Sequence, residues 1–326
     1  MRESAFVFLR GTFYRWMEVW PERCASLDEA PRVLGVGDLH LENFGTWRDT
    51  DDRLIWGVND VDEACRIPYT LDLVRLATSA LLAIREGHLA IAVPSACEAI
   101  LDGYESSLDV GGKAFTIEER HGWLRDAALA RARDPERSAR YWTKLKSCSP
   151  ASGRVPRKKL RAQLPDPEAR CVFVHRVTGV GSLGRQRFVA IARGKDGQPV
   201  AREAKALLPS AASWARGDDA PKIYLRKLLD AAVRVPDPCF VVTRHWIIRR
   251  LAPDIARIDL GDLPAERDEL KLLRAMGWET ANFHLGSKRR KIVKHLTGLK
   301  PRWLQRAAEE MAAATTEDFR AWVALE

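Results

Sequence analysis

Helix-like and strand-like hydrophobic patterns occur in separate blocks along this chain, and the order of the blocks restricts how it can fold. Residues 66–145 show helical spacing of apolar residues, most clearly in LDLVRLATSALLAIREG. A β-rich block over 170–252 follows, and from 265 onward the pattern is helical again. Helical segments on both sides of a β-rich block predict one helical lobe built from both ends of the chain. Such a lobe would bring the two termini close together.

Short apolar runs give the expected strands. Residues 1–65 combine turn residues with two strand-like runs, RVLGVGD and RLIWGVND. Later, CVFVHRV, RQRFVAIARG and PVAREAKALL predict three strands, with GKDGQP as the turn between the second and third, and CFVVTRHWIIRRL predicts more. A Pro-, Ser- and Lys-rich stretch separates the blocks. We expect an α+β fold with a helical part at 1–150, a linker at 151–169, a β-rich nucleotide-binding part at 170–252 and a helical return at 253–326.

Composition favours a globular cytoplasmic protein without a membrane span. The 326 residues are 46% hydrophobic and 30% charged, and no apolar run reaches the roughly 18 residues that cross a bilayer. The N-terminal segment has no secretory pattern, and the six cysteines are scattered, which argues against a zinc site or a disulfide framework. The net charge of +9 is concentrated in two runs, 154–161 and 288–294, which we interpret as solvated faces. Nucleic acid is a less favoured partner because no aromatic residues interrupt these runs.

The first candidate for chemistry is the loop Gly37-Asp38-Leu39-His40-Leu41-Glu42-Asn43, which follows the strand-like run VLGV. A carboxylate at Asp38 and an amide at Asn43 can point into one pocket from such a loop. The carboxylate can accept or orient a hydroxyl proton. The amide oxygen is a hard ligand suited to magnesium. A polar turn capped by Asp38 is the alternative interpretation.

The second candidate is the acidic stretch Asn59-Asp60-Val61-Asp62-Glu63, which follows the run RLIWGV. Three acids within four positions repel one another unless a cation offsets them. Magnesium held by Asp60, with Asp62 as a close second, would provide that offset together with substrate phosphates. The alternative is a solvated acidic turn.

A glycine-rich segment and a lysine complete the set. Gly179, Gly181 and Gly184 form a G-x-G-x-x-G pattern that also contains Ser182, and a strand-like run follows it. A glycine turn between antiparallel strands is typical of a kinase-type loop that covers phosphates. Lys205 lies on the third expected strand, from which it could reach phosphate groups. The alternatives are an ordinary glycine hairpin and a surface lysine.

Three segments resemble known kinase motifs. GDLHLENFG resembles the catalytic loop of aminoglycoside phosphotransferases and choline kinases, and WGVNDVDEA resembles the metal-binding strand end that follows it. PYTLDLVRLATSA resembles the next segment, in which an Asp braces the catalytic loop. The chain is most similar to the DUF2252 family of kinase-like bacterial proteins, through SAFVFLRG, GDLHLENFG, VNDVDEA, LDLVRLATS, GVGSLG and KALLPS.

The resemblance implies a protein-kinase-like two-lobe fold that uses ATP and Mg²⁺ to phosphorylate a hydroxyl acceptor of unknown identity. It implies these roles: Asp38 as catalytic base, Asn43, Asp60 and Asp62 as metal ligands, Gly179, Gly181, Ser182 and Gly184 over the phosphates, Lys205 on the phosphates, Asp72 as a brace, and His40 as a residue that shapes the loop.

The order of the motifs is circularly permuted relative to ordinary kinases, because Asp38 precedes the glycine segment and Lys205. GWETANFHLGS near the C-terminus resembles the helix that leads into the catalytic loop, so joining the chain ends would restore the usual order. The lysine motif reads K-A rather than K-E, and the sequence assigns no acidic partner to Lys205.

Three other functions use similar residues. A metallophosphoesterase is disfavoured because the seven histidines are isolated from one another and form no G-N-H element. A nucleotide-binding pseudokinase would lack catalysis, which the joint presence of Asp38, Asn43 and Asp60 argues against. A nucleotidyl transferase would use the same metal and phosphate groups with an inverted nucleotide and would leave AMP on the acceptor.

Overall fold

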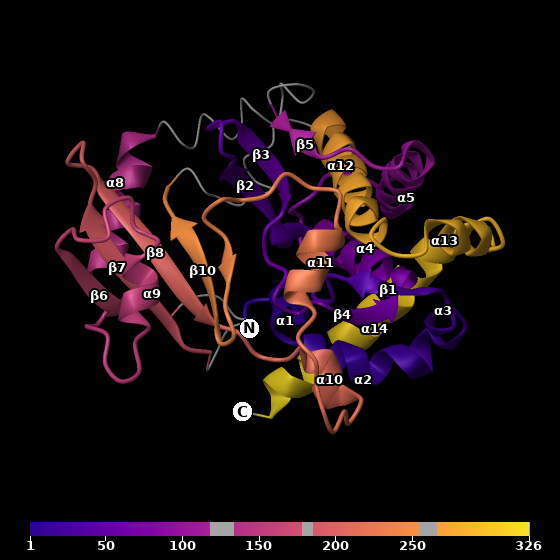
Figure 1. The fold of residues 1–326 in the computed structure, drawn as a ribbon. Coiled ribbons are helices and arrows are strands. Elements are labelled where there is room, and N and C mark those ends of the chain that lie inside the picture. The colour runs from indigo at the N-terminus through magenta and orange to yellow at the C-terminus, as the bar shows by residue number, and fades with distance from the viewer. Residues whose placement is uncertain (118–133, 178–184, 254–265, 326) are drawn as a thin grey trace.

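The computed structural model describes residues 1–117, 134–177, 185–253 and 266–325 of the chain. In it, a helical part and a part built around a five-stranded sheet lie side by side (Figure 1). The combination of many helices with antiparallel sheets confirms the predicted α+β class.

The helical part draws on both ends of the chain. Helix α14 packs against α4 and α1, and helix α12 packs against α5. The helices of this part are α1 (Ala5–Gly11), α2 (Phe13–Arg23), α3 (Ala25–Asp28), α4 (Tyr69–Arg85), α5 (Val93–Val110), α12 (Glu266–His284), α13 (Arg289–Leu296) and α14 (Trp303–Ala324).

Helix α4 forms the centre of the main hydrophobic core and is buried from Tyr69 to Ala83. A helix that is buried around its whole circumference must be surrounded by other elements. Here the surrounding elements include α1, α5, α12 and α14. No helix among the described residues has the length and apolar character needed to cross a bilayer.

The two chain ends meet in this part. Helix α1 contacts α14, and the Arg2 guanidinium lies 5.9 Å from the centre of the Trp322 ring. Phe8 packs against the same ring, with a centroid distance of 5.6 Å. Figure 1 shows the labelled ends of the chain near each other. The expectation that the helical segments from both ends form one unit with adjacent termini is confirmed.

The first 65 residues differ from the sequence-based expectation. Helices α1, α2 and α3 precede the first strand, whereas the sequence predicted only strands and turns in this region. In α2, the apolar residues Phe13, Trp16 and Trp20 recur every three or four positions and face the core. The runs RVLGVGD and RLIWGVND contain strands, as predicted.

Two small antiparallel sheets lie within the helical part. One pairs β1 (Arg32–Gly35) with β4 (Cys65–Pro68). The other contains β2 (Phe44–Arg48), β3 (Leu54–Val58) and β5 (Phe115–Thr116) in that order. Strands β1 and β3 lead into the loop that carries Asp38 and the acidic stretch that carries Asp60. A short 3₁₀ helix, η1 (Leu41–Asn43), leads into β2.

The five-stranded sheet has the order β6-β7-β8-β10-β9 with antiparallel neighbours. Its strands are β6 (Cys171–His175), β7 (Arg187–Arg193), β8 (Pro199–Ala206), β9 (Val241–Val242) and β10 (Trp246–Leu251). The three strands predicted around the turn GKDGQP, and the further strand after them, are therefore confirmed.

Two helices cover the sheet. Leu145 of α8 (Pro135–Lys146) packs among Val189 and its neighbours, and Leu160 of α9 (Arg157–Arg161) packs among Phe188 and its neighbours. Because Val189 and Phe188 are adjacent in β7, their side chains point to opposite faces of the sheet. Helices α8 and α9 come from the segments that the sequence analysis assigned to the helical part and the linker, and they lie with the sheet.

Between β8 and β9 the chain crosses back to the helical part. Helix α10 (Ala211–Ala215) packs on α2, and helix α11 (Leu225–Ala231) packs on α12. This crossing connects the end of β8, which carries Lys205, with the helical part.

Candidate functional site

Asp72 of α4 fixes the loop between β1 and η1 through hydrogen bonds from the loop backbone. The Asp72 carboxylate accepts hydrogen bonds from the backbone N–H groups of Val36 (2.7 Å) and Gly37 (2.9 Å), and it lies 3.0 Å from Nε2 of His284. Asp72 is completely buried. The contacts therefore fix the backbone just before Asp38.

Gly37 has a backbone conformation that a larger residue would strain. Its φ is +85°, and a Cβ at this position would lie 2.5 Å from the backbone oxygen of Glu63. The loop therefore runs directly against the acidic stretch. His40 caps η1, because its Nδ1 accepts a hydrogen bond from the backbone N–H of Glu42 at 3.2 Å.

Asp38 forms an ion pair with Arg75 of α4, a residue that sequence reasoning did not identify. Both Nε (3.0 Å) and Nη2 of Arg75 donate to Oδ1 of Asp38. Nη2 also donates to the backbone oxygen of Leu9 at 2.8 Å, and the guanidinium lies against the rings of Phe13 and Trp16. Arg75 is thus rigidly held, and it fixes one oxygen of the Asp38 carboxylate.

The pKa of Asp38 is set by two opposing effects. Burial raises the pKa to about 7, although the charge and hydrogen bonds of Arg75 lower it. A carboxylate with a pKa near neutrality is suited to exchange a proton with a ligand. The side chain retains 19% exposure, so a ligand can reach it.

Asn43 and the acidic stretch after β3 are neighbours. The backbone N–H of Asn59 donates to the backbone oxygen of Asn43 (2.9 Å), and Nδ2 of Asn43 donates to the backbone oxygen of Asp60 (3.2 Å). Because Nδ2 faces the backbone oxygen of Asp60, Oδ1 of Asn43 points away from that oxygen. Within the part of the chain that the structure describes, this buried oxygen has no hydrogen-bond donor.

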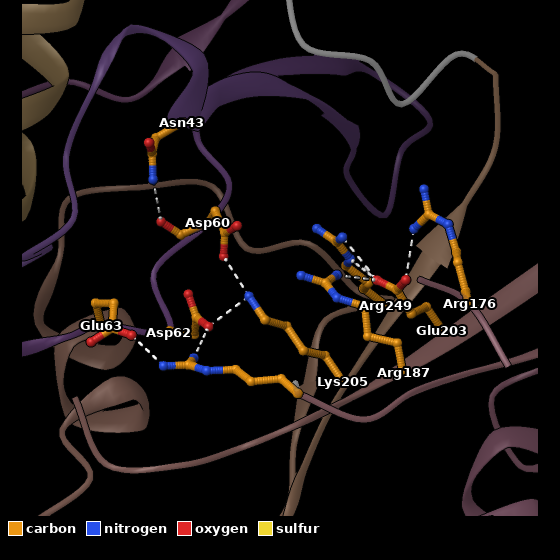
Figure 2. A network of polar contacts seen from close by, with 10 residues as sticks. Asn43, Asp60, Asp62, Glu63, Arg176, Arg187, Glu203, Lys205 and Arg249 are labelled. Carbon is orange, nitrogen blue, oxygen red and sulfur yellow. Dashed lines mark hydrogen bonds and ion pairs between the residues drawn. The ribbon is translucent and has the colours of Figure 1, made fainter. Parts of the chain in front are cut away.

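Lys205 reaches this stretch from the five-stranded sheet (Figure 2). Its Nζ lies 3.3 Å from Oδ1 of Asp60 and 2.6 Å from Oδ2 of Asp62. Asp60 and Lys205 are 145 positions apart in the chain. The two carboxylates are the acidic partners of Lys205 that the sequence left unassigned.

Burial and charge act in opposite directions on the two carboxylates. Burial alone would raise the pKa of Asp60, but Lys205 and Arg249 together outweigh it and hold that pKa below its usual range. Burial raises the pKa of Asp62, and the negative charge of Asp60 adds to the rise while Lys205 opposes it.

Arg185 is a second cation on the acidic stretch that sequence reasoning missed. Its guanidinium forms ion pairs with Asp62 and Glu63. The other carboxylate oxygen of Glu63 accepts from the backbone N–H of Ala211 at 2.6 Å, which ties the start of α10 to the same place. The predicted phosphate-covering residues just before Arg185 lie outside the described residues: Gly179, Gly181, Ser182 and Gly184.

Glu203, two positions before Lys205, is completely buried and forms ion pairs with three arginines. Oε1 lies 2.7 Å from Arg176, and Oε2 lies 3.2 Å from Arg187 and 2.8 Å from Arg249. Burial would raise the pKa of Glu203, but the three guanidinium groups outweigh it and hold the pKa far below its usual range. Figure 2 shows this cluster next to the contacts of Lys205.

The oxygen atoms near Asp60 fit a hard cation. A buried amide oxygen without a donor and two nearby carboxylates are the groups that Mg²⁺ prefers, with water or phosphate oxygens completing its shell. Among the described residues, no group of three or more His, Cys, Asp or Glu side chains is arranged to hold a metal. A metal at this place would therefore depend on Asn43, Asp60, Asp62 and oxygen atoms of a ligand.

Comparison with protein families gives a match for the N-terminal part of the chain. Residues 1–140 match the model of a family described as an uncharacterized protein conserved in bacteria (DUF2252). This supports the family resemblance for the part of the chain that contains Asp38, Asn43, Asp60, Asp62 and Asp72. Lys205 and the five-stranded sheet lie beyond the matched residues. Neither a curated protein nor a solved structure matches the chain.

Proposed function

We propose that this protein is an ATP- and Mg²⁺-dependent phosphotransferase that acts on a hydroxyl group and has a circularly permuted, kinase-like two-lobe arrangement. The observation that carries the proposal is the position of Lys205. A cation from the sheet lies 3.3 Å and 2.6 Å from two carboxylates beside the loop that carries Asp38 and Asn43. Phosphoryl transfer needs a cation for the phosphates, metal ligands and a group that orients the hydroxyl, and these residues offer all three.

Each residue has a definite task in this proposal. Asp38 accepts the hydroxyl proton through Oδ2, because Arg75 occupies Oδ1. Lys205 offsets phosphate charge, while Asn43 and Asp60 would hold Mg²⁺, with Asp62 beside them. When bound, Mg²⁺ would neutralise charge on the phosphate oxygens. Positioning and electrostatics would supply most of the rate enhancement.

Asp38→Asn tests the proposal. Wild-type protein is incubated with Mg²⁺, ATP labelled at the γ-phosphate and a mixture of hydroxyl-bearing metabolites, and labelled products are separated. We expect the variant to lose transfer by about 100-fold or more, because general base catalysis contributes about 10²–10⁴-fold. Nucleotide binding, measured by calorimetry, is expected to persist. Asp51→Asn is the matched control, since Asp51 lies on an exposed turn with a side chain 71% accessible.

The alternatives give different results when the incubation is also run with ATP labelled at the α-phosphate. Label on the acceptor from α-labelled ATP, with none from γ-labelled ATP, would identify a nucleotidyl transferase. Binding of Mg²⁺ and ATP with no transfer to any acceptor would identify a pseudokinase. Unchanged transfer by Asp38→Asn would remove Asp38 from the role of base.

A further inference from the structure

One face of the five-stranded sheet carries its charged residues at the end nearest Asp60. Lys205 of β8 lies opposite Arg187 of β7, and Glu203 of β8 lies opposite Arg249 of β10. Residues two apart on a strand point to the same face, so these four side chains share one side of the sheet. Figure 2 shows Arg187, Arg249 and Glu203 beside Lys205 and its contact with Asp60.

The remainder of this face is apolar and already covered. Leu145 of α8, with Tyr141 and Trp142 beside it, packs on the next residues of the same strands, which are Val189, Ile191, Ala201 and Leu251. A flat aromatic base would need an open apolar surface of this kind. Within the part of the chain that the structure describes, α8 occupies the apolar portion of this face, and the charged residues lie beyond it.

The charges at that end do not balance within the cluster. Glu203 supplies one negative charge to three guanidinium groups. Buried charges are costly unless they are compensated. Asp60 and Asp62 offset part of the excess, but both also pair with Lys205.

The cluster is open on one side. The side chains of Arg176 and Arg249 retain 21% and 26% of their accessible surface, while Glu203 between them retains none. A ligand from solvent can therefore contact the arginines without displacing Glu203. Planar guanidinium groups fixed by a shared carboxylate suit phosphate oxygens, which they can bind through paired hydrogen bonds.

We propose that Arg176, Arg187 and Arg249, held by Glu203, form a polyphosphate-binding subsite adjacent to Lys205. The subsite takes phosphate groups of the nucleotide that lie beyond the one Lys205 contacts. The identification of the polyphosphate as that of a nucleotide rests on the proposed function. The preference of the subsite for anions follows from the arginine cluster alone.

Calorimetry with inorganic tripolyphosphate tests the subsite without involving a base, a metal or an acceptor. The wild-type protein should bind tripolyphosphate, and binding should weaken as salt concentration rises. Arg249→Met removes one charge and keeps a similar apolar stem. We expect it to lower the affinity about tenfold, as the loss of one charge-assisted contact implies. Arg250→Met is the matched control, because Arg250 is the next residue of β10 and points to the opposite face.

Glu203→Gln provides a second test, in which the variant is expected to respond more strongly to the anion than wild type does. Loss of the carboxylate leaves three arginines that repel one another, so the variant should melt at a lower temperature than wild type. Tripolyphosphate should then raise the melting temperature of Glu203→Gln by more degrees than that of wild type. This comparison decides the question even if Arg249→Met fails to fold.

The subsite would be overturned by wild-type protein that does not bind tripolyphosphate. It would also be overturned by an Arg249→Met variant that binds tripolyphosphate as tightly as Arg250→Met does. A Glu203→Gln variant that gains no more stability from the anion than wild type would do the same. These failures are distinct from failure of the proposed function. The latter concerns label transfer from ATP and would leave tripolyphosphate binding unchanged.

Discussion

Glu279 is a carboxylic acid in the middle of α12 that is almost completely buried against β3. Its Oε2 accepts a hydrogen bond from Nδ2 of Asn282 at 2.9 Å, and its Oε1 lies so close to Gly57 that a Cβ there would be 2.3 Å away. Burial raises the pKa of Glu279 to about 7, although the hydrogen bond from Asn282 and the charge of Arg234 lower it. Ionising this side chain therefore costs folding free energy.

The Glu279→Gln variant should show a weaker dependence of stability on pH than wild type. A folded-state pKa above the unfolded value means that the folded protein binds the proton more tightly. The wild-type free energy of unfolding should therefore fall as pH rises from about 5 to about 7, by up to about 3 kcal/mol from this residue. Glutamine does not ionise, so the variant lacks this contribution. Urea unfolding between pH 5 and pH 8 measures the difference.

A residual slope is expected in Glu279→Gln, because Asp38 also has a raised pKa of about 7. Glu98→Gln on neighbouring α5 is the control, since Glu98 is exposed and its replacement should leave the wild-type slope in place. If the free energy of unfolding changes with pH equally in Glu279→Gln and in wild type, the buried carboxylate does not determine that pH dependence.

At the scale of single residues, the sequence led to the acids and to Lys205 but missed two arginines that bind the acids. Asp38, Asn43 and Asp60 follow strands in recognisable loops, so a local pattern points to them. Arg75 pairs with a residue 37 positions away, and Arg185 pairs with one 123 positions away. An ion pair between distant segments leaves no local pattern, and a single arginine is common in any sequence.

At the scale of elements, helices α5 and α12 cross in close backbone contact. A Cβ at Gly103 would lie 1.8 Å from the backbone oxygen of Arg274, and a Cβ at Gly277 would lie 2.0 Å from the backbone oxygen of Ile100. Backbone atoms cannot move aside without moving the helix. The two glycines therefore let the helices approach more closely than any larger residue would allow.

Gly277→Ala should separate α5 and α12 and destabilise the fold by about 3 kcal/mol or more, even though alanine favours helices. The free energy of unfolding in urea measures the loss. Gly298→Ala is the control, because the nearest atom to its added carbon would lie 3.4 Å away. A Gly277→Ala variant within about 0.5 kcal/mol of wild type would show that the crossing adapts to the added methyl group.

Element prediction succeeded where the hydrophobic period was long and regular. Strands β7 and β8 are short runs rich in apolar residues on either side of a Gly-containing turn, and α4 is rich in apolar residues at helical spacing, so both patterns were visible. Helix α1 spans seven residues, too few to establish a helical period. The attachment of α8 to the sheet depends on contacts with residues far along the chain, which its own sequence does not specify.

At the scale of the whole molecule, the adjacent termini predict that the fold tolerates a circular permutation of its segments. A permutant that joins the C-terminus to Met1 through about six Gly and Ser residues and opens at the exposed Gly153–Arg154 position should fold. Its melting temperature should lie within about 1.5 °C of the parent, which corresponds to about 1 kcal/mol for a chain of 326 residues. Circular dichroism and calorimetry provide the measurement.

Unjoined fragments 1–153 and 154–326, produced together, are the control for that permutant. They should lose stability on dilution, whereas the permutant should not, since its halves are covalently linked. A permutant that aggregates or melts without a cooperative transition would contradict the adjacency of the termini. The sequence anticipated this adjacency from helical blocks at both ends, because block order is a property of the whole chain.

Lys205 gives the acidic stretch a counter-ion that is tethered to the protein. With the ammonium group already between Asp60 and Asp62, a free divalent cation gains little electrostatic energy by entering alone. A polyanion that attracts the ammonium leaves the two carboxylates without their partner and so strengthens their attraction for a metal. By thermodynamic reciprocity, the metal strengthens the hold on the polyanion by the same factor. We therefore expect each of the two to bind more tightly when the other is present.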